Sequence, residues 1–302
     1  MRSFQHFCGI RGQACYFWFV VPIPYKLNRI PFQFHVAGQA LNGQVYPAPK
    51  SKAAVIIVHG MGEHSGRYER TVVPRLIENS IGVIAYDQFG HGINAGKKGH
   101  NPGYESVLDC VDLAIEKAER EFPGKPLFLY GHSMGGNVVV NYALRRPGRI
   151  SGVIATSPFL RLAFEPPAWK LSLGRLVAGI WPSMTMANEV DPAHLSRIEE
   201  EVEAYCRDPL VHDRVSPAYS IEFMSRGEWA LEHAGGLQVP MLLLHGTADR
   251  LTDWKASQEF AGKAGSRVEF LPVEGGFHEL HHDLEKDMML EKVVGWIRER
   301  AK

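Results

Sequence analysis

The sequence predicts an α/β fold with a doubly wound, mostly parallel central sheet, and three observations lead to this prediction. Short, continuous apolar runs recur along the chain, and such runs are typical of strands buried on both faces of a parallel sheet. Segments with helical periodicity separate these runs, and right-handed crossovers join strands of this kind into one sheet. The 302 residues exceed the most common domain size, but single α/β domains often reach this length.

The predicted strands begin with a hairpin of residues 32–36 and 39–46, which turns at Ala37-Gly38. Six further apolar runs have the length and composition of buried strands. They are residues 55–58, 82–86, 127–130, 153–156, 241–245 and 268–271. Several of these runs end directly before glycine, histidine or aspartate, so chemically active residues follow the carboxyl ends of the strands.

Helical spacing is clearest between the second and third of these runs. Apolar residues there share one helix face, and Pro123-Gly124 ends the pattern. They are Val107, Val111, Ile115, Ala118 and Phe122. Residues 137–146 and 284–300 also have the pattern of helices, which places helices on both faces of the predicted sheet.

Residues 160–237 contain no strand-like run and are predicted to form a helical cap or lid. After the Pro166-Pro167 break, apolar side chains recur at helical spacing, at Trp169, Leu173, Leu176, Val177 and Ile180. One interpretation is that this stripe packs on the core, and a compatible one is that it covers an apolar pocket and contacts lipid. The core is then residues 31–159 and 238–302. Residues 1–30 form an N-terminal extension whose order the sequence leaves open.

The strongest chemical signal is the segment Gly131-His132-Ser133-Met134-Gly135-Gly136, which lies between a predicted strand and a predicted helix. A tight strand-to-helix turn lifts a serine hydroxyl above the sheet edge, and its close neighbours must be glycines because a Cβ would not fit. The N-terminus of the following helix points at the same place. We therefore expect Ser133 to be a nucleophile and the Met134 N–H to stabilise an oxyanion.

The base and the acid that activate this serine are selected by chain order and context. In this fold class the order is serine, then an acid, then histidine, and both partners follow the ends of later strands. Asp249 follows the run that ends at residue 245, and His278 follows the run that ends near residue 271. Their rivals lie at a helix start or beyond the loop. These rivals are Asp253, Asp283, His281 and His282.

A second oxyanion donor is expected from the loop after an earlier strand. The segment His59-Gly60-Met61-Gly62 fits this position, and the Met61 N–H is the candidate. The alternative interpretation is an ordinary glycine turn.

Composition excludes several classes of function. The formal net charge is zero, so the sequence does not predict a nucleic-acid partner. The four cysteines, Cys8, Cys15, Cys110 and Cys206, match no zinc pattern, and we expect no metal and no cofactor. No apolar run approaches the ~20 residues that span a bilayer. We therefore expect a cytoplasmic protein, peripheral to the membrane if the lid contacts lipid. The sequence does not indicate the oligomeric state.

Taken together, these motifs resemble the monoacylglycerol lipase and lysophospholipase family of the α/β-hydrolases. The similarity extends from about residue 32 to the C-terminus. It is carried by H-G-M-G-E-H-S-G-R-Y from His59, G-H-S-M-G-G from Gly131, S-P-F-L from Ser157, A-Y-C-R-D-P-L-V from Ala204, H-G-T-A-D-R-L-T-D from His245 and F-H-E-L-H-H-D from Phe277. The resemblance implies an α/β-hydrolase fold with a helical lid insertion.

The resemblance also implies substrate-binding residues. A polar pocket that holds a glycerol head group would consist of Glu63, Arg67, Tyr205 and His281, and an acyl tunnel would pass Phe159 and Leu160. The alternative for Glu63 and Arg67 is an ion pair that only stabilises its loop.

The implied activity is a two-step hydrolysis of lipid esters, with monoacylglycerol as the expected substrate. Alternatives on the same scaffold are a lysophospholipase, a short-chain carboxylesterase, a thioesterase and an acyltransferase. A catalytically silent receptor with this fold is a different class, and it would have no need to keep Ser133, Asp249 and His278 together.

Overall fold

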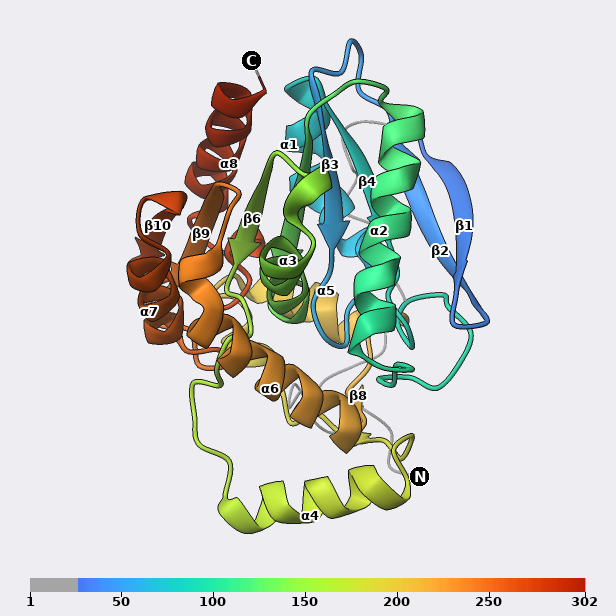
Figure 1. Cartoon of the computed structure of the whole chain (residues 1–302), viewed down its shortest axis with the longest axis vertical. Helices are drawn as coiled ribbons and strands as arrows, with labels where there is room; N and C mark the ends of the chain where they lie inside the picture. The colour runs from blue at the N-terminus through green and yellow to red at the C-terminus, as the bar shows by residue number, and fades with distance from the viewer. Residues whose placement is uncertain (1–26, 302) are drawn as a thin grey trace, which may run out of the picture.

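The computed structural model describes residues 27–301, and its centre is one eight-stranded sheet (Figure 1). The strands lie in the order β1-β2-β4-β3-β5-β6-β9-β10. Their bounds are β1 Ile30–Val36, β2 Gln39–Tyr46, β3 Ala53–Val58, β4 Ile81–Tyr86, β5 Leu127–His132, β6 Gly152–Thr156, β9 Met241–Gly246 and β10 Val268–Val273. β1 and β2 pair in antiparallel fashion, β2 is antiparallel to β4, and all remaining neighbours are parallel. The predicted mostly parallel sheet is confirmed.

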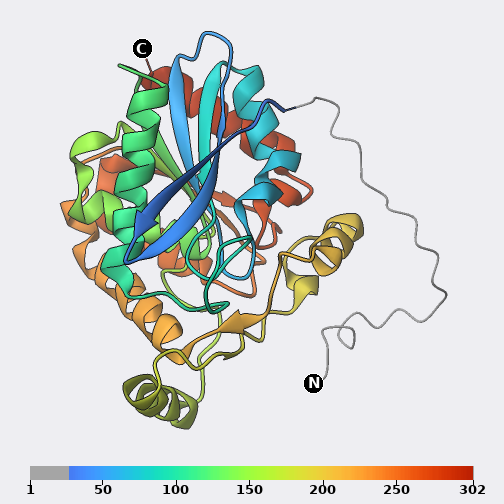
Figure 2. The same cartoon turned by 90° about the vertical axis from the view of Figure 1, so that its right-hand side faces the viewer.

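Helices cover both faces of this sheet, as Figure 2 shows from the side. Their bounds are α1 Val72–Glu78, α2 Tyr104–Glu121, α3 Met134–Arg145, α4 Ala168–Ile180, α5 Glu199–Arg207, α6 Pro217–His233, α7 Trp254–Ala264 and α8 Lys286–Arg300. One apolar core contains side chains of α2, α3 and α7, and the other contains side chains of α1 and α8. The central strands β3, β4 and β5 are buried along their whole length. This explains why their sequences are continuous apolar runs.

The segment between β6 and β9 contains α4, α5 and α6 and is called the cap below. α6 packs against both α3 and α4, so it lies between the sheet and α4 (Figure 1). A two-stranded ribbon of β7 (Met186–Ala187) and β8 (Arg214–Val215) joins distant parts of the cap. The division of the chain into a core and a cap of residues 160–237 remains a proposal.

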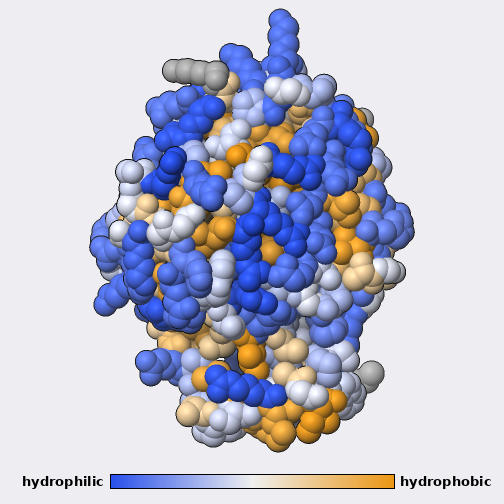
Figure 3. Space-filling view, in the orientation of Figure 1, coloured by the Kyte–Doolittle hydropathy of each residue, from blue (hydrophilic) through white to orange (hydrophobic). Residues whose placement is uncertain are grey.

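The interpretation that the apolar stripe of α4 packs on the core is wrong. Trp169 is 68% exposed, Leu173 51%, Leu176 59% and Ile180 77%. Residues i, i+4, i+7 and i+11 share one helix face, and here that face points away from α6. Figure 3 shows the resulting hydrophobic surface at the lower end of the molecule. Periodicity predicts that a helix has an apolar face but not what the face contacts.

No helix within residues 27–301 is both long enough and apolar enough to cross a membrane. The N-terminal extension expected at residues 1–30 lies almost wholly outside the described part of the chain.

The fold depends on a close approach between α3 and the carboxyl end of β3. A Cβ added to Gly135 would overlap the carbonyl oxygen of Val58. Backbone cannot move aside as a flexible side chain can, so we expect Gly135→Ala to lower the free energy of unfolding by about 3 kcal/mol. Gly148→Ala is the matched control, because a Cβ there meets nothing within 4 Å. Urea unfolding of both variants tests this, and equal stabilities would contradict the packing argument.

Candidate active site

Ser133 occupies a strained turn between β5 and α3. Its backbone has φ 53° and ψ −115°, a conformation that costs a non-glycine residue about 1–3 kcal/mol. The turn is held from both sides, since the Ser133 N–H donates to the Thr156 carbonyl oxygen at 3.0 Å and its own carbonyl accepts the N–H of Phe159 at 2.8 Å. The flanking glycines permit this geometry: a Cβ on Gly131 would overlap the Gly135 carbonyl. The hydroxyl therefore sits on the cavity side of the sheet edge.

Asp249 and His278 come from the loops after β9 and β10 and meet beside this turn. His278 Nδ1 lies 2.7 Å from Asp249 Oδ2, and both side chains are buried. The Asp249 carboxylate also accepts the N–H of Leu251 at 2.8 Å and the hydroxyl of Thr252 at 2.9 Å. His245 Nε2 lies 3.1 Å from the same oxygen. With its acceptor positions filled, the carboxylate is fixed in place and orients the His278 ring.

The electrostatics of the pair follow from burial and from the short contact. Burial raises the pKa of Asp249, but the neighbouring His278 and His245 lower it by more, so the net shift is downward and the group is ionised. Burial lowers the pKa of His278, whereas the charge and hydrogen bond of Asp249 raise it to above its ordinary value. The ring is therefore a stronger base than a free imidazole.

The sequence rivals of this pair have other partners. Asp253 is the N-cap of α7 and accepts the Lys255 N–H, while Asp283 binds Arg197. His282 Nδ1 lies 3.0 Å from Glu279. His281 is buried, and its ring stacks on Tyr68 with centroids 4.9 Å apart. Only Asp249 and His278, of the candidates compared, are hydrogen-bonded to each other next to Ser133.

The two expected oxyanion donors, Met61 and Met134, lie in the wall of the same cavity as Ser133. Met134 is the first residue of α3. The loop that carries Met61 is fixed by Glu63, whose Oε1 accepts the Gly60 N–H at 2.6 Å. Backbone N–H groups at a helix N-terminus and in a fixed loop can stabilise negative charge on a reacting oxygen.

Three buried charged side chains stand beside the loop of residues 59–62, which is called the oxyanion loop below. The Arg67 guanidinium contacts Glu63 Oε2 at 2.8 Å and binds both oxygens of Glu279, at 2.5 and 2.8 Å. The ring of Tyr205 lies 4.7 Å from the guanidinium carbon. Burial lowers the pKa of Arg67, but the two carboxylates raise it further, so it stays charged. Glu279 was not among the predicted site residues, although it directly follows His278 in the F-H-E-L-H-H-D motif.

The six expected substrate-binding residues separate into two groups in the structure. Glu63, Tyr205 and Phe159 line the cavity with Ser133 and His278. Arg67 and His281 are buried and lie behind its wall, whereas Leu160, also buried, lines the second cavity described below. The ion pair weighed as an alternative for Glu63 and Arg67 is present, and it extends to Glu279.

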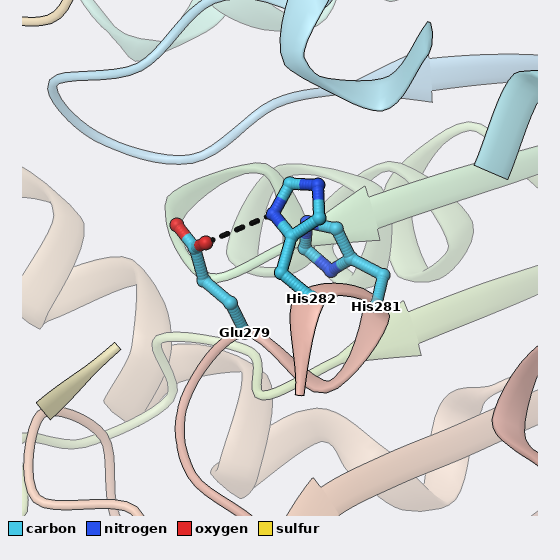
Figure 4. Close-up of side chains that lie close together, drawn as sticks. All are labelled: Glu279, His281 and His282. Atoms are coloured by element: carbon cyan, nitrogen blue, oxygen red, sulfur yellow. Dashed lines mark hydrogen bonds and ion pairs between the residues drawn. The ribbon is translucent and has the colours of Figure 1, made fainter. Parts of the chain in front are cut away.

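A second cluster has the residue types of a metal site but not the chemistry. Figure 4 shows Glu279, His281 and His282, whose ligand atoms lie within 4.8 Å of one another. Both carboxylate oxygens of Glu279 already accept hydrogen bonds from Arg67, and His282 Nδ1 shares one of them. A divalent cation would have to displace a buried guanidinium, so these residues do not fit a metal ion.

The cavity that contains these groups has a volume of about 330 Å³. Most of its wall is apolar, with side chains from the core and from the cap: Phe159, Leu162, Leu171, Val215, Ile221, Phe223 and Met224. Four of its residues also line a second cavity between α4 and α6, namely Leu162, Leu171, Ile221 and Met224. The polar end, at Glu63, Tyr205 and Glu279, is next to the oxyanion loop. Such a division suits an amphiphilic ligand.

Comparisons with known proteins agree with this architecture. A family model described as serine aminopeptidase, S33, matches residues 49–285. Monoglyceride lipase of Homo sapiens is 31% identical over 288 residues, which cover 92% of this chain and 93% of the human protein. An uncharacterized abhydrolase domain-containing protein of Dictyostelium discoideum is 37% identical over 84% of this chain, but the chain spans only 27% of that longer protein.

Among solved structures, monoacylglycerol lipase of Paleococcus ferrophilus superposes with a TM-score of 0.80 at 34% identity, covering 86% of this chain and 99% of that chain. The mostly parallel sheet and the strained strand-to-helix turn at Ser133 are those of an α/β-hydrolase. The chain belongs to the serine aminopeptidase S33 family. Within it, the chain belongs to the monoacylglycerol lipase branch, a group of carboxylic ester hydrolases.

The His278–Asp249 contact generates a testable pH dependence. A fluorophosphonate reacts with an activated serine, and activation requires neutral His278. Because the pKa of His278 is raised, we expect the rate of Ser133 labelling to increase with pH across a range above the ordinary histidine pKa. In Asp249→Asn burial remains without the compensating charge. The acid limb should then move to lower pH, and the plateau should fall by about four orders of magnitude.

The matched control is Asp253→Asn, since asparagine caps a helix as well as aspartate does. This variant should keep the wild-type labelling profile. An acid limb that stays in place in Asp249→Asn would show that another group sets the protonation of the base.

Proposed function

We propose that this protein hydrolyses monoacylglycerol to glycerol and a fatty acid through Ser133, His278 and Asp249. The observation that carries the proposal is the hydrogen-bonded Asp249–His278 pair beside the Ser133 turn. Ser133 and His278 line the same largely apolar cavity. An apolar wall suits an acyl chain better than the charged N-terminus of a peptide. The monoglyceride lipase of Homo sapiens and the monoacylglycerol lipase of Paleococcus ferrophilus support this choice of substrate.

The first half of the reaction forms an acyl-enzyme. His278 binds Asp249 through Nδ1, which leaves Nε2 to take the Ser133 proton. The serine oxygen attacks the ester carbonyl carbon, and the Met61 and Met134 N–H groups donate hydrogen bonds to the oxyanion that forms. Each donor lowers the activation free energy by about 3 kcal/mol. The tetrahedral intermediate then collapses. The bond to the alcohol oxygen breaks, and His278 gives that oxygen the proton.

The second half repeats these steps with water. His278 takes a proton from water as the water attacks the acyl carbonyl, and collapse of the new intermediate returns the proton to Ser133 and releases the fatty acid. Asp249 keeps its charge throughout and stabilises the imidazolium form of His278. The chemistry needs only these side chains and backbone groups.

Fatty-acid release from three esters tests the substrate. Monooleoylglycerol, lysophosphatidylcholine and a short-chain ester are supplied at equal concentration, with Ser133→Ala as the control. We expect the monoacylglycerol to be the best substrate and the variant to lose at least about 10³-fold in kcat. Preference for lysophosphatidylcholine would make the protein a lysophospholipase. Activity on the short ester alone would keep the serine mechanism and end the lipase assignment.

The exposed apolar face of α4 supports a proposal that this helix contacts a lipid surface. Trp169, Leu173, Leu176 and Ile180 form one stripe, and Trp181 next to it is 58% exposed. Aromatic and aliphatic side chains on one side of a surface helix are typical of helices that lie in a membrane interface. α4 also carries Leu171, which lines the catalytic cavity. We therefore propose that α4 rests on the lipid surface from which the substrate enters the cavity.

Replacement of this stripe should weaken membrane binding without changing the catalytic residues. For the double variant L173E and L176E we expect at least about tenfold weaker binding to phosphatidylcholine vesicles, because two apolar side chains no longer enter the interface. Sedimentation with vesicles measures this. Leu284→Glu is the control, since Leu284 is an equally exposed leucine (62%) outside the cap. Equal losses in the two proteins would contradict a specific role for α4.

A further inference from the structure

One side-chain amide in the wall of the catalytic cavity has a donor that no neighbour uses. Asn188 follows β7 in the cap and lines the cavity. Its Oδ1 accepts the backbone N–H of Val190 at 3.1 Å. Only the oxygen of an amide can accept a hydrogen bond, so this contact determines which way the side chain is turned. The Nδ2 group is buried and has no acceptor within the described residues 27–301.

This donor is located at the polar end of the cavity, next to the oxyanion loop. Asn188 Nδ2 is 3.4 Å from the point where a Cβ on Gly62 would lie, and the Tyr205 hydroxyl oxygen is 3.6 Å from the same point. Gly62 directly follows Met61, whose N–H is the proposed oxyanion donor. Two polar groups, one amide and one phenol, therefore lie beside Gly62 at the polar end of the cavity.

The cations at the cavity already have anionic partners: Lys170, in its wall, donates to Glu189, and Arg67 donates to two carboxylates. Arg67 lies behind the wall, and its two terminal nitrogens already donate to Glu63 and Glu279. Moving it toward a ligand would leave two buried carboxylates without their partner, which is unfavourable. A hydrogen-bond donor for the alcohol must therefore come from another residue.

The position of Asn188 is fixed by the cap. Its backbone N–H donates to the Asp213 carbonyl oxygen at 2.6 Å, next to the pairing of β7 with β8. The His212 N–H in turn donates to the Gly62 carbonyl at 2.8 Å, which ties this part of the cap to the oxyanion loop. The amide is thus held beside the oxyanion loop, and a specificity-determining group requires such a fixed position.

We propose that Asn188 Nδ2 donates a hydrogen bond to a free hydroxyl of the leaving alcohol and so gives the enzyme its preference for esters of polyols. The inference rests on the proposed ester hydrolase function and adds the residue that recognises the alcohol. The ligand class is an uncharged polyol: two carboxylates and one guanidinium stand at this end of the cavity, which disfavours an anionic head group. A buried donor that only the correct substrate satisfies discriminates strongly against alcohols without a hydroxyl.

The test compares two esters of the same acyl chain in the same detergent micelles. Monooleoylglycerol offers free hydroxyls on its leaving alcohol, and methyl oleate offers none. Two variants remove the donor: Asn188→Asp keeps an oxygen for the Val190 N–H, and Asn188→Leu keeps the volume. In both we expect the ratio of kcat/KM for monooleoylglycerol to that for methyl oleate to fall about tenfold, the effect of one hydrogen bond. The methyl oleate rate itself should stay near the wild-type value.

Asn79→Asp is the matched control, because Asn79 ends α1, donates to the Arg75 carbonyl and is not part of the cavity wall. It should leave the ratio unchanged. An unchanged ratio in both Asn188 variants overturns the inference, and so does an equal loss on both esters, which would mean that Asn188 only supports the cap. Both results leave the Ser133-dependent hydrolysis intact. If the wild-type protein cleaves neither ester, the result contradicts the proposed hydrolase function itself and not only the role of Asn188.

Discussion

The close packing of α3 against the ends of β3 and β5 is the constraint on which the rest of the site depends. Because positions 131 and 135 are glycines, the backbone of α3 packs directly against the ends of β3 and β5. The chain therefore turns from β5 into α3 at a single residue, Ser133, whose φ is positive. Hydrogen bonds from both flanking segments hold it there. The strain is thus stored by the surrounding sheet, and the hydroxyl cannot relax into the helix or the strand.

A buried ionic network then links the two loops that must face this serine. Glu63 holds the N–H of Gly60 in the oxyanion loop, Arg67 joins Glu63 to Glu279, and Glu279 directly follows His278. The pKa values of both carboxylates are lowered despite burial, which by itself raises them, because Arg67 lies between them. Removing one member would leave a buried charge unpaired, so the network favours a single arrangement of the loops. The network therefore matters because it fixes the positions of the two loops, and not because it adds to the free energy of unfolding.

The sequence allowed prediction of the sheet and of the residues at its edge for a physical reason. Strands buried on both faces must be apolar throughout, as β3 and β4 are, so they stand out without an alignment. Parallel strands also end at one edge, which brings Ser133, Asp249 and His278 together although they are far apart in the chain. Contacts that depend on side-chain direction were not predictable. Arg67 meets Glu279 across 212 positions, and no local pattern marks that pairing.

The cap shows why periodicity alone could not define its role. α4 has its larger apolar side chains outward, while Leu171 on its opposite side lines the cavity. The chain that follows α4 reaches β7 and places the Asn188 amide beside the oxyanion loop. One insertion therefore joins an apolar outer surface, an apolar inner wall and a polar donor near the reaction centre. Under the proposed function, an amphiphilic ester that leaves a lipid surface with its polar head toward Ser133 meets these environments in that order. We therefore propose that the cap, rather than the catalytic residues, selects the substrate.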